Sequence, residues 1–217
     1  MPIVGTPLPG LSLRIAQDGE VLVKGGNVSP GYHDDNAAND EAFDEHGWLR
    51  SGDIGRRDEH GYVYITDRKK DLIITAAGKN VAPQELENVL RQNEIVSQVV
   101  VIGEGRPYLT ALVTLDEEAA PAWGREHGIS GPLNDIAAHP RTLEEIGAAI
   151  EELNRSVSRP EQIKRFRVLD RDFTQERDEI TPTLKVKRRR IADLYGPIID
   201  EMYAGEAPRA GAVSASG

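Results

Sequence analysis

The sequence predicts an α+β fold in which a β-rich first part precedes a small sheet flanked by helices. Up to residue 67, short runs of alternating apolar and polar residues are separated by clusters of Gly, Asp and Asn, a pattern typical of strands joined by turns. After residue 71, two strongly apolar runs lie between segments with the spacing of amphipathic helices. The charged pentapeptide DRKKD, at 67–71, separates the two parts.

In the first part, two segments have the alternation of half-buried strands. GEVLVKG (19–25) alternates around Val21 and Val23, and GYVYITD (61–67) alternates around Val63 and Ile65. The intervening segments DDNAAND and DEHGW are rich in Asp, Asn and Gly, which favour turns. With so few helical residues, this part cannot cover both faces of a sheet, so we expect it to be a piece of a larger β-rich body.

The second part begins with a short apolar strand and then alternates helix and strand. LIIT (72–75) predicts the strand, and the following AAGKN predicts a hairpin-like turn. Pro83 suits the first position of a helix. The runs 95–103 and 108–115 predict two strands that pair in antiparallel fashion across the polar turn EGRP.

Further helices are predicted towards the C-terminal end. Residues 116–127 have a helical composition, with Pro121 in the first turns, and 166–170 (FRVLD) predict a strand. The last helix starts near Lys187, is broken or kinked at 196–197 and continues to Tyr203, while 205–217 have the composition of a disordered tail. Spacings of three and four residues predict one long amphipathic helix, carried by Leu143, Ile146, Ile150, Leu153 and Val157.

Composition limits the classes of function. The 217 residues contain no cysteine, which excludes disulfides and thiolate zinc sites and fits a cytoplasmic location. No run approaches the ~18 consecutive apolar residues of a membrane span. The net charge of −10 disfavours nucleic-acid binding, yet the cations gather at 68–70 and 185–190, as expected for binding a compact anion such as a nucleotide. The histidines lack metal-ligand spacing, so no metal site is predicted.

Four strings in a fixed order carry a resemblance to a known family. They are GWLRSGD ending at Asp53, DRKKD, LIITAAGKNVAPQELE, and ITPTLKVKRRR, which contains Lys185. Together they resemble the C-terminal portion of the adenylate-forming (AMP-dependent) ligases, specifically the long-chain fatty-acid–CoA ligase branch. The resemblance implies that 1–67 are the β-rich end of a large N-terminal lobe, 68–71 a hinge and 72–204 a small, mobile C-terminal lobe.

The resemblance assigns three residues to the nucleotide. Asp53, read as the end of a Gly-rich turn, accepts hydrogen bonds from the ribose hydroxyls, a charge-assisted contact. The guanidinium group of Arg68 donates hydrogen bonds to ribose or phosphate oxygens. Ile65 packs against adenine. The alternatives for these residues are a turn aspartate, a solvated surface cation and a core isoleucine.

Further residues are assigned to lobe movement and to coenzyme A. Lys70 is the hinge residue, whose exposed side chain lets its backbone rotate without breaking buried contacts. Gly78 and Ala77 occupy the place where the family usually has paired glycines, beside the pantetheine arm of coenzyme A. The methyl group of Ala77 narrows that approach without closing it. A surface lysine is the alternative for Lys70.

Lys185 is the predicted catalytic residue. TPTLKVKR resembles the family's lysine loop, with Leu184 in place of the usual glycine. A compact cation is needed there because a carboxylate attacks an α-phosphate, and the two anions repel each other. The alternative is a basic helix start that serves solubility or nucleic-acid binding.

The resemblance implies a two-step reaction. ATP with Mg²⁺ and a fatty acid give an acyl-adenylate and pyrophosphate; rotation about Lys70 then lets coenzyme A attack the adenylate. We expect the N-terminal lobe as a partner in cis, no Mg²⁺ ligand in this chain and no nucleic-acid partner, with peripheral membrane association left open. The family's phosphate loop and fatty-acid tunnel are not in these residues, so the chain alone is expected to be inactive. A fatty acyl-AMP ligase that supplies a carrier protein, and a non-catalytic binding module, are the alternatives.

Overall fold

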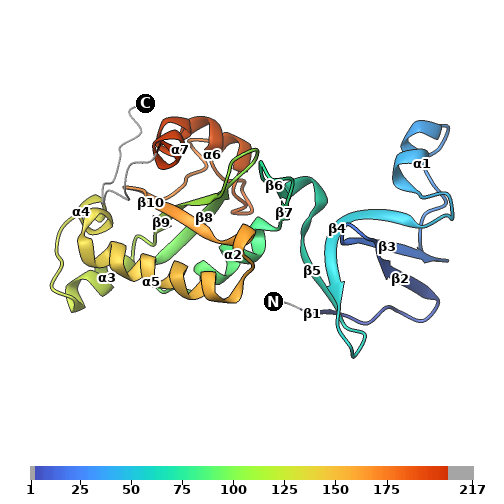
Figure 1. Cartoon of the computed structure of the whole chain (residues 1–217), viewed down its shortest axis with the longest axis horizontal. Helices are drawn as coiled ribbons and strands as arrows, with labels where there is room; N and C mark the ends of the chain where they lie inside the picture. Colours follow the sequence, from blue (N-terminus) through green and yellow to red (C-terminus); the bar gives the residue numbers. More distant parts are fainter. Residues whose placement is uncertain (1–2, 205–217) are drawn as a thin grey trace. The chain divides into compact units, whose positions relative to one another are not determined.

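The computed structural model describes residues 3–204, which form two compact units, one ending at Leu72 and the other beginning at Ile73. Each unit has its own sheets, which can be followed by label in Figure 1. They are described separately below.

The first unit is a five-stranded antiparallel sheet with the order β1-β5-β4-β3-β2. Few apolar side chains of this unit are buried, chiefly Val21, Leu22 and Val63. A single sheet with so small a core is weakly stabilised by its own burial. Its elements are β1 (Ile3–Gly5), β2 (Leu11–Ile15), β3 (Glu20–Gly25), α1 (Asn36–Ala42), β4 (Leu49–Arg57), β5 (Val63–Arg68) and the 3₁₀ turn η1 (Lys69–Asp71).

Two predictions for this unit are wrong. Part of DDNAAND forms helix α1 instead of turns, because the Asp35 carboxylate caps the helix by accepting the Ala38 N–H at 2.9 Å. GWLRSGD does not end in a free turn, because residues from Leu49 onward join β4. Pairing with strands on both sides outweighs the turn preference of Ser, Gly and Asp. The two strands predicted around Val21 and Val63 are confirmed as β3 and β5.

The second unit has a three-stranded sheet with the order β10-β9-β8 and a separate β6–β7 hairpin. Strands β8 and β9 pair antiparallel, whereas β9 and β10 pair parallel. The strands are β6 (Ile73–Ile74), β7 (Asn80–Val81), β8 (Val96–Ile102), β9 (Leu109–Leu115) and β10 (Ile163–Val168). The helices are α2 (Pro83–Leu90), α3 (Ala119–Glu126), α4 (Leu133–Ala138), α5 (Pro140–Ser156), the 3₁₀ turn η2 (Arg159–Glu161), α6 (Arg188–Leu194) and α7 (Gly196–Tyr203).

Apolar side chains cover both faces of this sheet, and every residue of β9 is buried. Val99, Val101 and Val113 belong to a cluster that also contains residues of α2 to α5. Val100 and Leu112 belong to a second cluster with residues of α6 and α7. Because successive side chains of a strand point to opposite faces, the sheet lies between two helical layers, with α6 and α7 on one face and α5 on the other in Figure 1.

Most element predictions for this unit are confirmed. The antiparallel strand pair, the helix beginning at Pro83, the long amphipathic helix and the final helix interrupted near Gly196 are all present. Helix α4 was not predicted, and β10 starts at Ile163, before the predicted strand. The predicted disordered tail lies outside the described residues. Within 3–204, no helix has both the length and the apolar character to cross a membrane.

Candidate functional site

The two polar residues predicted to grip a nucleotide sugar lie side by side in the first unit. Asp53 on β4 and Arg68 at the end of β5 are cross-strand partners. Arg68 Nε lies 2.7 Å from Asp53 Oδ1, and the side chains are 58% and 29% exposed. Strand pairing therefore joins residues fifteen positions apart into one partly exposed ion pair.

A bulge in β4 explains how Asp53 is presented. Glu20 of β3 pairs with Ile54, but Leu22 pairs with Arg50, so β4 contains two more residues than β3 over this stretch. The Ser51 hydroxyl donates to the Val21 carbonyl at 2.7 Å and accepts the Asp53 N–H at 3.1 Å. Such bulges redirect side chains next to functional sites.

Gly52, within this bulge, has a φ of +71°. A side chain would have open space there, so the glycine is required by backbone conformation and not by crowding. The glycine of the SGD string thus has a local structural reason.

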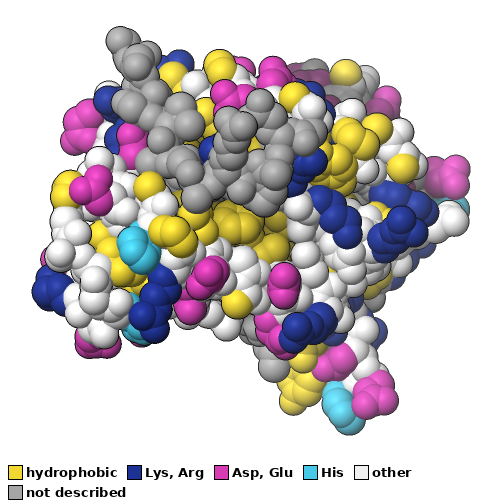
Figure 2. All heavy atoms as spheres, turned by 60° about the vertical axis from the view of Figure 1, so that its left-hand side comes forward, with side chains coloured by type: hydrophobic (Ala, Val, Ile, Leu, Met, Phe, Trp, Pro, Cys, Tyr) yellow, Lys and Arg dark blue, Asp and Glu magenta, His cyan; other side chains and the backbone are white. Residues whose placement is uncertain are grey.

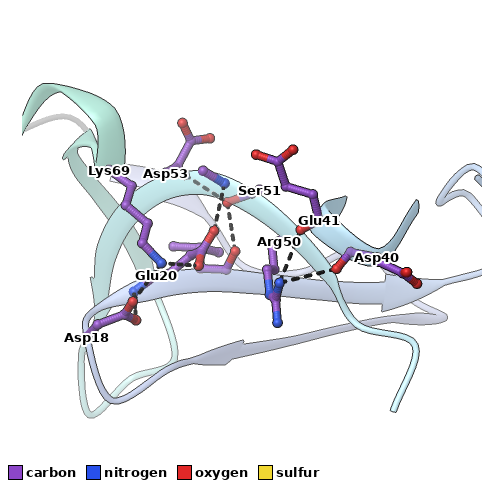
Figure 3. Close-up of polar contacts among 10 residues, drawn as sticks. Asp18, Glu20, Asp40, Glu41, Arg50, Ser51, Asp53 and Lys69 are labelled. Carbon is purple, nitrogen blue, oxygen red and sulfur yellow. Dashed lines mark hydrogen bonds and ion pairs between the residues drawn. The ribbon is translucent and has the colours of Figure 1, made fainter. Parts of the chain in front are cut away.

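Glu20 and Lys69 lie beside the predicted Asp53–Arg68 site, and the sequence predicts no role for either of them there. Glu20 is only 4% exposed; its Oε1 accepts the Gly52 N–H at 3.1 Å and its Oε2 accepts Lys69 Nζ at 2.8 Å. Lys69 Nζ also donates to Asp18 Oδ2 at 2.7 Å. Figure 3 shows the Glu20 carboxylate lying between Lys69 and the bulge that bears Asp53. The sequence places Glu20 in an alternating strand, and its burial becomes apparent only in the fold.

These contacts change the ionisation of the exposed partners. The hydrogen bond from Lys69 holds the pKa of the Asp18 carboxyl below its ordinary value. Hydrogen bonds to Asp18 and Glu20 raise the pKa of the Lys69 ammonium group. Lys69 therefore stays charged at neutral pH.

Ile65 lies on β5 opposite Gly55 and is half-buried. Ile54 pairs with Asp67 and Gly55 with Ile65, so Thr66 is an extra residue that bulges β5 between Ile65 and Arg68. A side chain on Gly55 would meet the Tyr64 carbonyl at 2.6 Å and Val21 at 2.8 Å. Packing over Gly55 gives Ile65 a structural role, and its contact with adenine stays a prediction.

The predicted hinge residue and the predicted coenzyme A turn are both exposed. Lys70 lies in η1. Ala77 and Gly78 lie in the turn between β6 and β7, where the Gly78 N–H donates to the Thr75 carbonyl at 2.8 Å. Gly78 has a φ of +72° and open space around it. The turn itself explains the glycine, and the open space is compatible with a close approach by a ligand.

Lys185 is presented by a short hairpin in the second unit. Ile180 and Val186 form an isolated antiparallel bridge, and the Thr181 N–H donates to the Lys185 carbonyl at 2.8 Å. The Lys185 N–H donates in turn to the Thr181 hydroxyl at 3.1 Å. Leu184 has a φ of +59°, the left-handed conformation that favours glycine. The side chain of Lys185 is exposed beside it.

A buried ionic network holds the base of this hairpin. Glu179, whose side chain is fully buried, accepts two hydrogen bonds from Arg171, at 2.8 and 2.6 Å, and one from the Tyr195 hydroxyl at 2.9 Å. Its backbone carbonyl accepts the Lys187 N–H at 2.8 Å. Burial by itself raises the pKa of the Glu179 carboxyl, but the bonds from Arg171, the Thr174 N–H and Tyr195 outweigh it, so the pKa lies below its ordinary value. The network was not predicted from sequence.

The basic run KVKRRR is partly occupied by internal contacts. Lys187 pairs with Asp178, and Arg188 donates to the Val101 carbonyl at 2.7 Å and pairs with Glu87 at 2.7 Å. On the face shown in Figure 2, Lys and Arg side chains form separate groups interspersed with Asp and Glu. These contacts give part of the basic run a structural role.

Residues 3–204 contain no group of three or more His, Asp or Glu side chains placed to hold a metal ion. The paired carboxylates of Asp18 and Glu20 are engaged by Lys69.

A family comparison agrees with this arrangement of elements. The model of the AMP-binding enzyme C-terminal domain matches residues 70–207, which include the predicted hinge residue Lys70, the Gly78 turn and the Lys185 hairpin. The chain belongs to this family. It thus corresponds to the C-terminal portion of an enzyme of the adenylate-forming superfamily, as the four sequence strings predicted.

Curated relatives of this AMP-binding C-terminal domain are fatty-acid–CoA ligases. The long-chain-fatty-acid–CoA ligase FadD15 of Mycobacterium tuberculosis is 45% identical over 94% of this chain and 34% of its own length. The human long-chain-fatty-acid–CoA ligase 1 is 33% identical over 93% of this chain and 31% of its own length. The chain therefore spans about a third of these relatives.

Solved structures share the fold. The o-succinylbenzoate CoA synthetase of Bacillus subtilis, in complex with its acyl-adenylate intermediate, matches with a TM-score of 0.60 and 26% identity, covering 87% of this chain and 35% of its own. The adenylation domain of a carboxylic acid reductase from Segniliparus rugosus, with AMP bound, has a TM-score of 0.66 at 22% identity over 93% of this chain and 32% of its own. The second match supports the fold alone.

Proposed function

We propose that this chain is the C-terminal part of an AMP-forming long-chain fatty-acid–CoA ligase. The observation that carries the proposal is the 45% identity to FadD15 over 94% of the chain. The exposed Asp53–Arg68 pair and the exposed Lys185 hairpin support it. Because the chain spans about a third of such relatives, the phosphate loop and the fatty-acid tunnel belong to an N-terminal lobe in cis, and we expect the chain alone to catalyse no ATP–pyrophosphate exchange.

In this proposal the first unit grips the nucleotide sugar. The ion pair engages Arg68 Nε and Asp53 Oδ1. The second carboxylate oxygen of Asp53 accepts the ribose hydroxyls, and the terminal N–H groups of Arg68 donate to sugar or phosphate oxygens. Ile65 contributes an apolar contact to adenine. ATP brings Mg²⁺, whose charge neutralises the phosphates, and no step is assigned to a metal ligand in this chain.

Lys185 acts in the first half-reaction. A carboxylate oxygen of the fatty acid attacks the α-phosphorus of ATP, a new P–O bond forms, and pyrophosphate leaves with the electrons of the bond that breaks. The ammonium group of Lys185 lies between the two anions and stabilises the charge that develops in the transition state.

Rotation about Lys70 then withdraws Lys185 and brings the Gly78 turn to the adenylate. The sulfur of coenzyme A then attacks the acyl carbon and forms a C–S bond, the thiol proton passes to solvent, and AMP leaves with the electrons of the acyl C–O bond.

Replacing Lys185 by alanine in the full-length ligase tests this assignment. We expect ATP–pyrophosphate exchange to fall by about 10²–10³-fold, the usual effect of removing one electrostatic donor. Conversion of preformed acyl-adenylate and coenzyme A to acyl-CoA is expected to change by less than about tenfold, because that step does not use Lys185. Arg189→Ala, an exposed cation four residues away, is the control and should leave both half-reactions unchanged.

Unchanged exchange in Lys185→Ala, with an active wild type, would contradict the catalytic role and favour a non-catalytic module. Acyl-CoA formation by the wild type identifies coenzyme A as the acceptor. Adenylate that accumulates without acyl-CoA would favour transfer to a carrier protein instead. The proposal includes a cytoplasmic location, with peripheral contact to a membrane surface as its variant.

A further inference from the structure

The Glu20 carboxylate has no role in the reaction proposed above, yet it is buried. A buried carboxylate destabilises the fold unless hydrogen bonds or a counter-charge compensate for its lost hydration. Its two oxygens make contacts with different segments: one accepts the Gly52 N–H at 3.1 Å and the other accepts Lys69 Nζ at 2.8 Å. Glu20 thus connects β4 to η1, the 3₁₀ turn that follows β5 (Figure 3).

The first contact stabilises the bulge that presents Asp53. The register of β3 and β4 shifts between Glu20 and Leu22, and the Glu20 carboxylate satisfies the Gly52 N–H at this irregularity. An N–H that is shielded from water and has no acceptor is costly, so this bond to the partly buried Gly52 favours the bulged conformation. Because Asp53 directly follows Gly52, the bond also helps to set the position of its carboxylate.

The second contact holds the segment next to the hinge. Lys69 is bound by Glu20 and Asp18, and Arg68 is bound by Asp53. Two successive residues are thereby tied to the sheet of the first unit. Lys70 follows directly. Its side chain, unlike those of Arg68 and Lys69, makes no hydrogen bond or ion pair with any residue in the range 3–204. Beyond Lys69, the segment is held by the backbone hydrogen bond from the Leu72 N–H to the Lys69 carbonyl, at 3.4 Å, and not by a side chain of Lys70.

We propose that Glu20 and Lys69 form a clamp, a pair of positioning residues that keeps the sugar-gripping Asp53–Arg68 pair in place while the chain pivots at Lys70. This inference rests on the proposed ligase function. The clamp would let the nucleotide keep the same contacts in both half-reactions, because the pivot lies beyond Lys69. It also explains why a lysine beside the hinge is paired with a buried carboxylate.

Hydrogen exchange of the full-length ligase, in which the first unit has its larger body, tests the coupling without any assay of activity. Lys69→Met and Glu20→Ala are each expected to speed amide exchange at least threefold in both segments 50–54 and 68–72. Glu20→Gln keeps an acceptor for the Gly52 N–H, so its effect should be confined to 68–72.

Arg14→Met is the matched control, because Arg14 is also in an ion pair of this unit and is 45% exposed, against 46% for Lys69. It should change neither segment. Faster exchange at 68–72 alone in Glu20→Ala would overturn the clamp.

Kinetics of the full-length ligase test the consequence for nucleotide binding. For Lys69→Met, we expect the KM for ATP to rise about three- to tenfold and the KM for fatty acid to change less than twofold. A merely structural defect would change both constants and lower Tm in parallel. An ATP KM within twofold of wild type would overturn the positioning role. Absence of exchange activity in the wild type would instead refute the proposed function, while the hydrogen-exchange result still decides whether the clamp exists.

Discussion

At the scale of single residues, Leu184 shows how a substitution can be tolerated at a strained position. Its φ of +59° is left-handed, and a side chain there costs about 1–2 kcal/mol that glycine avoids. The family's usual lysine loop has glycine at the matching place, so the conformation has a ready explanation. The hydrogen bonds of Thr181 to Leu184 and Lys185 hold the turn in spite of this cost.

We predict that glycine is better than alanine at position 184. Leu184→Gly removes the strain, whereas Leu184→Ala keeps a Cβ in the left-handed region, so the glycine variant should have an unfolding free energy higher by about 1 kcal/mol. Urea unfolding measures the difference. The same two substitutions at Val89, an exposed residue of α2, should give the opposite order because alanine is favoured in helices. Equal stabilities at 184 would contradict strain at Leu184.

At the scale of elements, the Lys185 hairpin is short and depends on its base. Its single bridge, between Ile180 and Val186, supplies little stability. The buried Glu179 connects the hairpin to Arg171 and to α6 through Tyr195. The position of Lys185 thus depends on a network whose members are distant from it in the sequence.

Glu179→Gln should destabilise the second unit by about 2–4 kcal/mol, since removing one partner leaves the Arg171 charge without its counter-charge. Arg171 is a quarter exposed, which keeps the effect near the lower end. Glu152→Gln is a control because it removes an exposed pair with Arg155 and should change stability by less than about 1 kcal/mol. A loss no larger than that of the control would show that the network is dispensable.

The contribution of Glu179 to the stability of the fold should decrease as the pH is lowered. Its folded-state pKa lies below the ordinary value of 4.5, so the folded state favours the ionised form. The stabilisation is present above pH 4.5 and is lost as the pH falls towards and through the lowered pKa. The difference in unfolding free energy between wild type and Glu179→Gln should therefore be constant from pH 7 down to about pH 5 and shrink as the pH falls below 4.5. A difference that grows on acidification would contradict the assigned direction.

At the scale of the whole molecule, the two units differ in how well each supports itself. The second unit buries apolar clusters on both faces of its sheet, whereas the first buries few large apolar side chains. Stability follows buried apolar area and must exceed the conformational entropy lost on folding. The first unit therefore depends for its stability on contacts with further residues of a larger β-rich domain.

A fragment of residues 73–204 is expected to fold alone, and a fragment of residues 1–72 to be largely unfolded. Circular dichroism and cooperative urea unfolding of the two purified fragments measure this. The intact chain is the control for the signal of each part. A cooperative transition of the 1–72 fragment in water would show that its small core suffices.

Local sequence patterns predicted the helices and strands correctly where the apolar periodicity matched the residues that the fold buries. The β8–β9 pair, α2 and α5 were predicted because continuous apolar runs, Pro83 and three–four spacing each encode local geometry. It failed at α1, where the Asp35 cap and not composition decided the structure, and at α4, whose short length gives little periodicity. Glu20 and Glu179 look like ordinary surface acids in the sequence, because burial and partners are set by residues far along the chain.

The amino-acid order alone determined the α+β class, the family and which residues bear suitable chemistry, because these depend on local spacing and residue type. The fold decided that Asp53 and Arg68 are cross-strand partners, that Glu20 joins the bulge to Lys69 and that Glu179 anchors the Lys185 hairpin. These contacts depend on strand register and on burial of charge. Both are set only when distant segments pack together.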